Sequence, residues 1–172
     1  MTDGTLNVLF ICTANAGRSQ MAEAILTSQG GGRVRGHSAG VAPAEALHPQ
    51  AEEVLREMGH DTGQLAPKPL SVFEAPDAVQ MDFVFTLCDQ AAGEVCPAWP
   101  GQPVTAHWGL PDPSKAGGTA AEQALAFRQC YRVLDRRIGA ILALPLASLD
   151  RLSLRRRMAE IGEGAADEVA PA

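Results

Sequence analysis

Cys12-Thr13-Ala14-Asn15-Ala16-Gly17-Arg18-Ser19 is the stretch that decides the fold. It follows the apolar segment 6–11 and precedes a helix-like segment at 19–28. A strand, a turn of small residues and a helix start thus follow one another. Backbone N–H groups in such a turn point inward, and the helix start adds positive potential. The sequence therefore predicts a loop that binds a tetrahedral oxyanion, supported by Thr13, Ala14, Asn15, Ala16, Gly17, Arg18 and Ser19.

Cys12 is the candidate nucleophile of this loop. A neighbouring arginine and a helix N-terminus both stabilise a thiolate, and Arg18 can grip an anion with two parallel N–H donors. A thiolate beneath a bound oxyanion is placed to attack its central atom. Asn15 suits a position with positive φ, and the Ser19 hydroxyl can donate to the thiolate. The alternative is that Cys12 is a buried structural cysteine at a strand end.

The composition excludes several classes of protein. The chain has 172 residues, of which 46% are hydrophobic, and this length fits one domain. We expect the domain at 1–162 and a flexible tail at 163–172. No apolar run reaches the roughly 20 residues of a membrane span, and no signal-like segment opens the chain, so we expect a cytoplasmic protein. The net charge of −6 argues against a nucleic-acid partner.

Strand and helix patterns alternate along the chain. Strand candidates lie at 6–11, 33–39, 81–87 and 104–108, and helix candidates lie at 19–28, 47–58 and 119–144. This alternation predicts a single α/β domain with a four-stranded parallel sheet flanked by helices. Thr119 and Glu122 predict a capping box at the start of the last helix. Ligands of such sheets bind at the carboxyl ends of strands, where the Cys12 loop lies.

Three further cysteines follow Cys12. Cys88 ends the strand candidate 81–87, at the same sheet edge as Cys12, and Cys96 follows eight positions later. Two thiols near an activated thiol can form a relay by thiol–disulfide exchange. Alternatively, each is a buried small apolar residue, which is how we interpret Cys130. The cysteine spacings do not match a zinc site, so we expect no metal and no other cofactor.

Asp112 is the candidate general acid. It lies between Pro111 and Pro113, which fix a turn after the strand candidate 104–108. A carboxyl group at the edge of an anion site can protonate a leaving oxygen. The alternative is an ordinary turn aspartate.

Together these stretches resemble the arsenate reductases built on the low-molecular-weight protein tyrosine phosphatase fold, over roughly residues 7–144. That family has a C-x5-R-S loop followed by QMAE, as at 12–23 here. It also has C-D-x-A and C-P segments, as at 88–91 and 96–97, and an H-W-G stretch ending in D-P, as at 107–113. The S-A-G after its second strand is found at 38–40.

The resemblance implies a mechanism. Cys12 would attack arsenate, for which phosphate or sulfate are analogues, while Arg18 and the loop amides hold it and Asp112 protonates the departing oxygen. Cys88 would attack Cys12 and release arsenite, and Cys96 would then attack Cys88. Thioredoxin or another thiol reductant would reduce the Cys88–Cys96 disulfide; the sequence leaves open thioredoxin, glutaredoxin with glutathione, and mycothiol.

Two other functions stay open at this point. A phosphatase of the same fold would use Cys12, Arg18 and Asp112 on phosphate monoesters, with water replacing Cys88. The extra cysteines favour reduction, and so does Ser114, because phosphatases of this fold usually place an aromatic residue there. A non-catalytic anion sensor would leave the extra cysteines without a role.

The chain departs from the family at a potassium site that some members have. Asn15, Glu23 and Ser38 match that site, but Lys68 stands in the segment 67–70 where an aspartate is expected. We hypothesise that the Lys68 ammonium replaces the cation.

Overall fold

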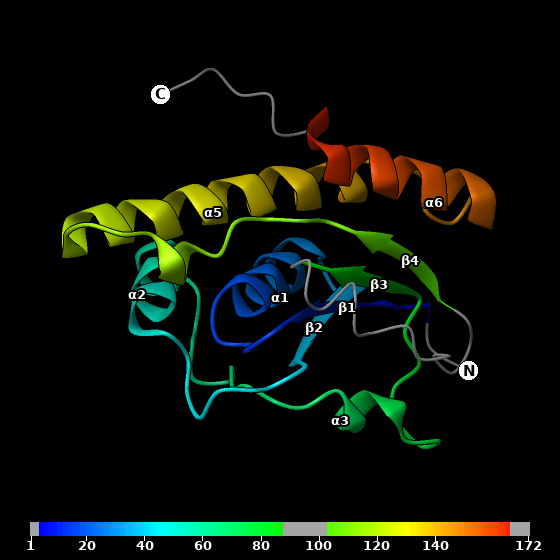
Figure 1. Cartoon of the computed structure of the whole chain (residues 1–172). Helices are drawn as coiled ribbons and strands as arrows, with labels where there is room; N and C mark the ends of the chain where they lie inside the picture. Colours follow the sequence, from blue (N-terminus) through cyan, green and yellow to red (C-terminus); the bar gives the residue numbers. More distant parts are fainter. Residues whose placement is uncertain (1–3, 88–102, 166–172) are drawn as a thin grey trace.

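A single parallel sheet forms the centre of the computed structural model, which describes residues 4–87 and 103–165. The strand order is β2-β1-β3-β4 (Figure 1). The strands are β1 (Leu6–Cys12), β2 (Val34–Gly40), β3 (Phe83–Thr86) and β4 (Val104–His107). The predicted α/β class and four parallel strands are confirmed.

Strand β1 lies at the centre of the core. Val8, Leu9, Phe10 and Ile11 are each at most 1% exposed. A strand covered on both faces has an unbroken apolar run, which is the pattern that the sequence shows here. The register pairs Cys12 with Gly40 of β2, so the nucleophile candidate ends β1 beside the last residue of β2.

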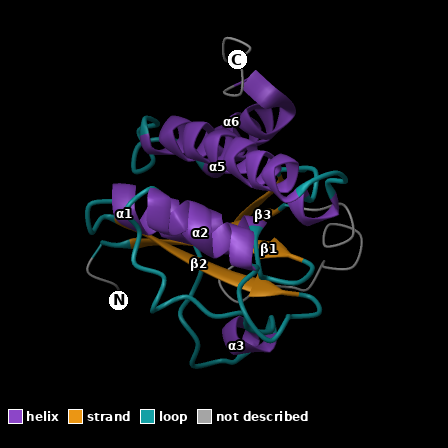
Figure 2. Ribbon diagram, turned by 90° about the vertical axis from the view of Figure 1, so that its left-hand side faces the viewer, coloured by secondary structure: helices purple, strands orange, loops and turns teal. Residues whose placement is uncertain are grey.

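Helices cover the sheet unequally. Figure 2 shows α1, α2 and α5 stacked on one side of the sheet and α3 on the other. The helices are α1 (Arg18–Gln29), α2 (Pro49–Glu57), α3 (Ser71–Glu74), α5 (Ala120–Leu142) and α6 (Arg151–Glu160), with a 3-10 turn η1 (Pro113–Lys115) and a π-helical turn η2 (Ile161–Ala165). No described helix is long and apolar enough to cross a bilayer.

Helix α5 is the long helix that the sequence predicts. The Thr119 side chain accepts from the Glu122 N–H, and the Glu122 side chain accepts from the Thr119 N–H, so the capping box is confirmed. The apolar stripe of α5 that faces the core is buried at Phe127, Tyr131, Leu134, Ile138 and Ile141. Cys130 is 7% exposed, in agreement with its structural interpretation.

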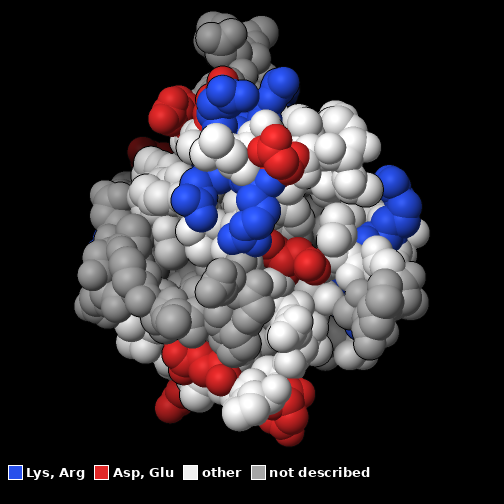
Figure 3. Space-filling view, turned by 90° about the vertical axis from the view of Figure 1, so that its right-hand side faces the viewer, with Lys and Arg blue, Asp and Glu red and all other residues white. Residues whose placement is uncertain are grey.

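Helices α3 and α6 were not predicted. The Asp150 carboxylate caps α6 by accepting from the Ser153 N–H at 2.8 Å, and Leu154 and Met158 are buried. The Met158 carbonyl accepts from the Trp108 indole at 2.8 Å, which fixes α6 beside β4. The exposed arginines of α6 contribute to the basic upper part of the face in Figure 3. They are Arg151, Arg155, Arg156 and Arg157.

Strand β3 begins later than the predicted strand 81–87, because the side chain of Asp82 bonds to the backbone of β1. Its carboxylate accepts from the Asn7 backbone N–H at 2.7 Å, beside the first residues of β1, so the regular strand starts at Phe83.

At the other end of the chain, the helical turn η2 includes the first residues of the expected tail, and 166–172 lie outside the described residues. The division into a domain and a tail stays a prediction.

Candidate active site

The carbonyl groups of the loop between β1 and α1 are held by hydrogen bonds to other parts of the chain. Four of them accept from backbone N–H groups of the segment 41–48, at 2.8 to 3.1 Å, and the Asn15 carbonyl accepts from the Gln20 amide at 3.0 Å. The four are the carbonyls of Cys12, Thr13, Ala14 and Ala16. A trans peptide is planar, so the N–H that follows each of these carbonyls points the opposite way. The N–H groups of residues 13–17 therefore point away from these partners, as they would in a backbone nest for an anion. Anion binding by this loop stays a prediction.

Asn15 and Gly40 hold this loop in shape. Asn15 has φ of 52°, the positive value that the sequence predicts. Its side chain donates to Ser19 Oγ at 2.7 Å and accepts from the Lys68 backbone N–H at 2.9 Å. A Cβ added to Gly40 would lie 2.8 Å from both Asn15 Cβ and the Thr13 carbonyl oxygen. Only glycine lets β2 approach the loop this closely.

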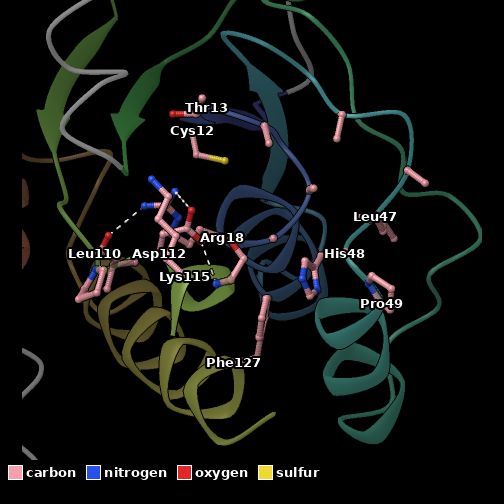
Figure 4. A pocket seen from close by; sticks show the side chains of 17 residues that line it. Cys12, Thr13, Arg18, Leu47, His48, Pro49, Leu110, Asp112, Lys115 and Phe127 are labelled. Atoms are coloured by element: carbon pink, nitrogen blue, oxygen red, sulfur yellow. Dashed lines mark hydrogen bonds and ion pairs between the residues drawn. The ribbon is translucent and has the colours of Figure 1, made fainter. Parts of the chain in front are cut away.

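Cys12 lies at the floor of the nest. Its sulfur points into the pocket (Figure 4), although the residue is only 2% exposed. The Ser19 hydroxyl is 2.9 Å from Cys12 Sγ, and Ser19 receives the Asn15 amide on its oxygen. Because Ser19 Oγ accepts from Asn15, its hydroxyl hydrogen is available for a hydrogen bond to Cys12 Sγ.

Arg18 connects the loop to Asp112. Its Nη1 donates to the Leu110 carbonyl at 2.9 Å, and its Nη2 lies 3.5 Å from Asp112 Oδ2. The Arg18 and Asp112 side chains are 8% and 28% exposed. The structure thus brings Cys12 and Arg18, at the two ends of one loop, and the distant Asp112 to one pocket. Their catalytic roles stay predictions.

The electrostatics of Asp112 favour its charged form. Burial opposes ionisation, but the two Ser114 hydrogen bonds and the charges of Arg18 and Lys115 outweigh it, so the pKa of Asp112 is lowered. A general acid must begin protonated. Asp112 therefore needs a change in its surroundings, such as an anion that competes for Arg18, before it can donate a proton.

The pocket has a volume of about 740 Å³ and one largely apolar wall. His48 stacks on Phe127 with ring centroids 4.6 Å apart, and both line the pocket opposite Asp112 (Figure 4). Leu47 and Leu110 add further apolar surface. The volume exceeds the needs of one tetrahedral anion, so the pocket can also admit the group that carries an anion.

His48 is a pocket residue that the sequence alone did not single out. The residue is half-buried, accepts from the Gln50 N–H as the N-cap of α2, and donates its backbone N–H to the Ala16 carbonyl. The predicted helix 47–58 begins two residues later, at Pro49, for this reason. A histidine followed by proline at the first helical position is the pattern that could have revealed the cap.

The Lys68 ammonium lies beside Ser38 and Glu23, two of the residues that match the potassium site. Its Nζ is 3.3 Å from the Ser38 carbonyl oxygen and 3.8 Å from Glu23 Oε1, which accepts from the Ser38 hydroxyl at 2.6 Å. Burial raises the pKa of Glu23, although Ser38 and the Lys68 charge act against it. The described residues contain no group of three or more His, Cys, Asp or Glu suited to a metal ion.

Cys88 and Cys96 lie outside the described residues, so the relay stays a prediction. Leu87, which precedes Cys88, donates its N–H to the Ile11 carbonyl at 2.8 Å, one residue before Cys12. Leu87, the last residue described before this segment, therefore lies beside the end of β1. Burial raises the pKa of Cys130 to about 12, a second reason to leave that thiol out of the chemistry.

Comparisons with known proteins agree with this geometry. Residues 7–153 match the family described as low molecular weight phosphotyrosine protein phosphatase. The chain belongs to this family. An arsenate reductase of Halalkalibacterium halodurans is 35% identical over 76% of this chain and 91% of its own length. One of Bacillus subtilis is 32% identical over the same shares. Within the family, the chain groups with the arsenate reductases.

Solved structures of the family show the same fold. A structure described as an arsenate reductase in the phosphate binding state has a TM-score of 0.67 and 28% identity, covering 81% of this chain and 98% of its own. The thioredoxin-dependent arsenate reductase of Corynebacterium glutamicum has a TM-score of 0.56 and 32% identity, covering 81% of this chain and 64% of its own.

Proposed function

We propose that this chain reduces arsenate to arsenite with a relay of three thiols. The observation that supports the proposal is that Cys12, the loop that follows it and Arg18 line one pocket, where the loop amides are placed to form a nest. Such a nest holds a tetrahedral oxyanion against the sulfur, and relatives of this family at about a third identity are arsenate reductases. We assign all of these steps to the domain 1–162 and none to the tail 163–172.

In the first step the Cys12 thiolate attacks the arsenic atom. A sulfur–arsenic bond forms and an arsenic–oxygen bond breaks. Asp112 supplies a proton to the departing hydroxyl group of the arsenate, which leaves as water. The nest amides and the Arg18 guanidinium stabilise the negative charge on the remaining oxygens throughout the step. Arsenic stays in its oxidised state at this point.

In the second step the Cys88 thiolate attacks Cys12 Sγ. The sulfur–arsenic bond breaks, its electron pair stays on arsenic, and arsenite leaves while a Cys12–Cys88 disulfide forms. Cys96 then attacks Cys88 by thiol–disulfide exchange and frees the Cys12 thiolate. Two thiols are oxidised for each arsenate reduced, so the electrons balance.

A thiol reductant must reduce the Cys88–Cys96 disulfide. The similarity to a thioredoxin-dependent relative supports a dithiol protein of the thioredoxin kind as this partner. We propose it as the electron donor, with no nucleic acid or membrane involved. A cytoplasmic location fits a cycle that depends on reduced thiols.

Hydrolysis of aryl phosphates is a second candidate for the same nucleophile. The stacked His48 and Phe127 rings and Leu110 give the pocket an apolar wall that an aromatic ring can contact. Only Cys12, Arg18 and Asp112 are needed for this reaction, because water takes the part of Cys88.

Replacing Cys88 by serine separates the two reactions. Cys88→Ser should abolish arsenate turnover and leave any hydrolysis of an aryl phosphate intact, because only reduction needs the second thiol. Cys130→Ala is the matched control: it removes a cysteine outside the relay, and arsenate turnover should persist. If arsenate reduction continues in Cys88→Ser, the relay is wrong.

A further inference from the structure

Ser114 binds one oxygen of the Asp112 carboxylate twice. The Ser114 backbone N–H lies 2.9 Å from Asp112 Oδ1, and its hydroxyl lies 2.7 Å from the same atom. Asp112 is the N-cap of the turn η1, whose first residue is Pro113, so the turn itself brings Ser114 back to the carboxylate. Ser114 also lines the pocket.

The second oxygen of Asp112 has different surroundings. Oδ2 lies 3.5 Å from Arg18 Nη2. Oδ1 therefore accepts from two donors, whereas Oδ2 faces the Arg18 guanidinium, which we propose also holds the substrate anion. The two oxygens of this carboxyl group are not equivalent.

We propose that Ser114 is a positioning residue that fixes which oxygen of Asp112 carries the proton. It holds Oδ1 with two hydrogen bonds, so that the proton resides on Oδ2 and is presented to the departing oxygen of the substrate. The inference deepens the proposed function, because it rests on Asp112 acting as the general acid.

The hydrogen bonds around the Asp112 carboxyl group determine which of its oxygens is protonated. Protonation at Oδ1 would compete with at least one Ser114 hydrogen bond, whereas protonation at Oδ2 leaves both in place. When Oδ2 gives up its proton, the departing oxygen leaves as water and the Asp112 carboxylate remains. Both Ser114 bonds then strengthen, because hydrogen bonds to a charged acceptor are the stronger ones. Ser114 thus makes Asp112 a stronger acid in the reaction.

To test this inference, the rate of arsenite formation in a single turnover of the whole chain is measured as a function of pH. Ser114→Ala removes the hydroxyl bond and keeps the backbone bond. Asp112 should then lose its proton at higher pH, so the falling limb of the profile should move up by roughly half to one pH unit. Ser114→Thr keeps a hydroxyl and should restore the wild-type profile.

Asp112→Asn separates failure of this inference from failure of the proposed function. If Asp112→Asn loses turnover and Ser114→Ala keeps the wild-type limb, Ser114 has no positioning role and the inference fails alone. If Asp112→Asn turns over as the wild type does, the acid step of the proposed function is wrong, and the inference fails with it.

The effect of Ser114 on the titration of Asp112 can also be measured without turnover. Carbon-13 NMR of the Asp112 carboxyl group can be titrated in Cys12→Ser with sulfate bound. The midpoint should be higher when Ser114 is alanine than when it is serine or threonine. Equal midpoints in all three backgrounds would overturn the inference.

Discussion

The Arg18 guanidinium lies 3.5 Å from Asp112 Oδ2 while it donates to the Leu110 carbonyl at 2.9 Å. The residue that we propose to bind the oxyanion is thus also a partner of the residue that we propose as the proton donor. An anion in the nest competes with Asp112 for the same guanidinium. Binding of substrate and protonation of Asp112 should therefore be coupled.

Sulfate binding should be accompanied by uptake of a proton at Asp112. The charge of Arg18 helps to lower the pKa of Asp112, and a bound dianion both engages Arg18 and repels the carboxylate, so the pKa should rise on binding. Sulfate does not titrate in the weakly acidic range, which makes it the suitable probe. Calorimetry of Cys12→Ser in buffers of different ionisation enthalpy measures the uptake. Asp112→Asn is the control and should show none; equal uptake in both would contradict the coupling.

Potassium should leave the wild-type chain unchanged. The Lys68 ammonium already lies 3.3 Å from the Ser38 carbonyl oxygen and 3.8 Å from Glu23 Oε1. Turnover and the urea midpoint should be equal in potassium and sodium at the same ionic strength. Lys68→Ala removes the ammonium, and this variant should gain stability from potassium. Clear potassium activation of the wild type would refute the replacement of the cation by Lys68.

Gly40→Ala should weaken oxyanion binding. Its Cβ would come within 2.8 Å of the Thr13 carbonyl oxygen and Asn15 Cβ, so the loop must shift. We expect the dissociation constant for phosphate to rise about tenfold, or ~1.4 kcal/mol. Gly139→Ala in α5 is the matched control, because no atom lies within 4 Å of its new Cβ. That variant should bind phosphate normally and gain ~0.5–1 kcal/mol of stability. Normal binding by Gly40→Ala would contradict the close approach of β2.

His37 should make the chain less stable as the pH falls below about 6.5. Burial, together with the charges of Arg35 and Lys68, lowers the pKa of His37 from 6.5 to about 4. Between these values the unfolded chain binds the proton and the folded chain does not, so stability falls with pH. Gln at this position keeps a donor for Asn7 Oδ1, which lies 3.0 Å from His37 Nε2, and cannot titrate. The urea midpoint should drop less between pH 7 and pH 4.5 in His37→Gln than in the wild type. Equal drops would show that His37 does not contribute.

The sequence predicts the parts of this protein that local patterns determine. The β1–α1 loop, the positive φ of Asn15 and the capping box at Thr119 all follow from residue types at short spacing. The parallel sheet follows from the alternation of strands and helices. These features need no knowledge of distant contacts.

Long-range contacts explain what the sequence did not predict. The pairing of Arg18 with Leu110 and Asp112 joins residues about 90 positions apart in the chain. The wall formed by His48 and Phe127 likewise depends on how α2 meets α5. The hydrogen bonds of the loop carbonyls depend on the segment 41–48, which has no regular pattern of its own.

The location of the disulfide after one turnover tests the central claim most directly. The fully reduced chain is mixed with arsenate in the absence of any other thiol, quenched with acid and digested for mass spectrometry, while arsenite is counted. We predict one arsenite per chain and a disulfide between Cys88 and Cys96, with Cys12 again a free thiol. Arsenite formed without any loss of free thiols, or a Cys12–Cys88 disulfide that accumulates in the unmutated chain, would contradict the relay.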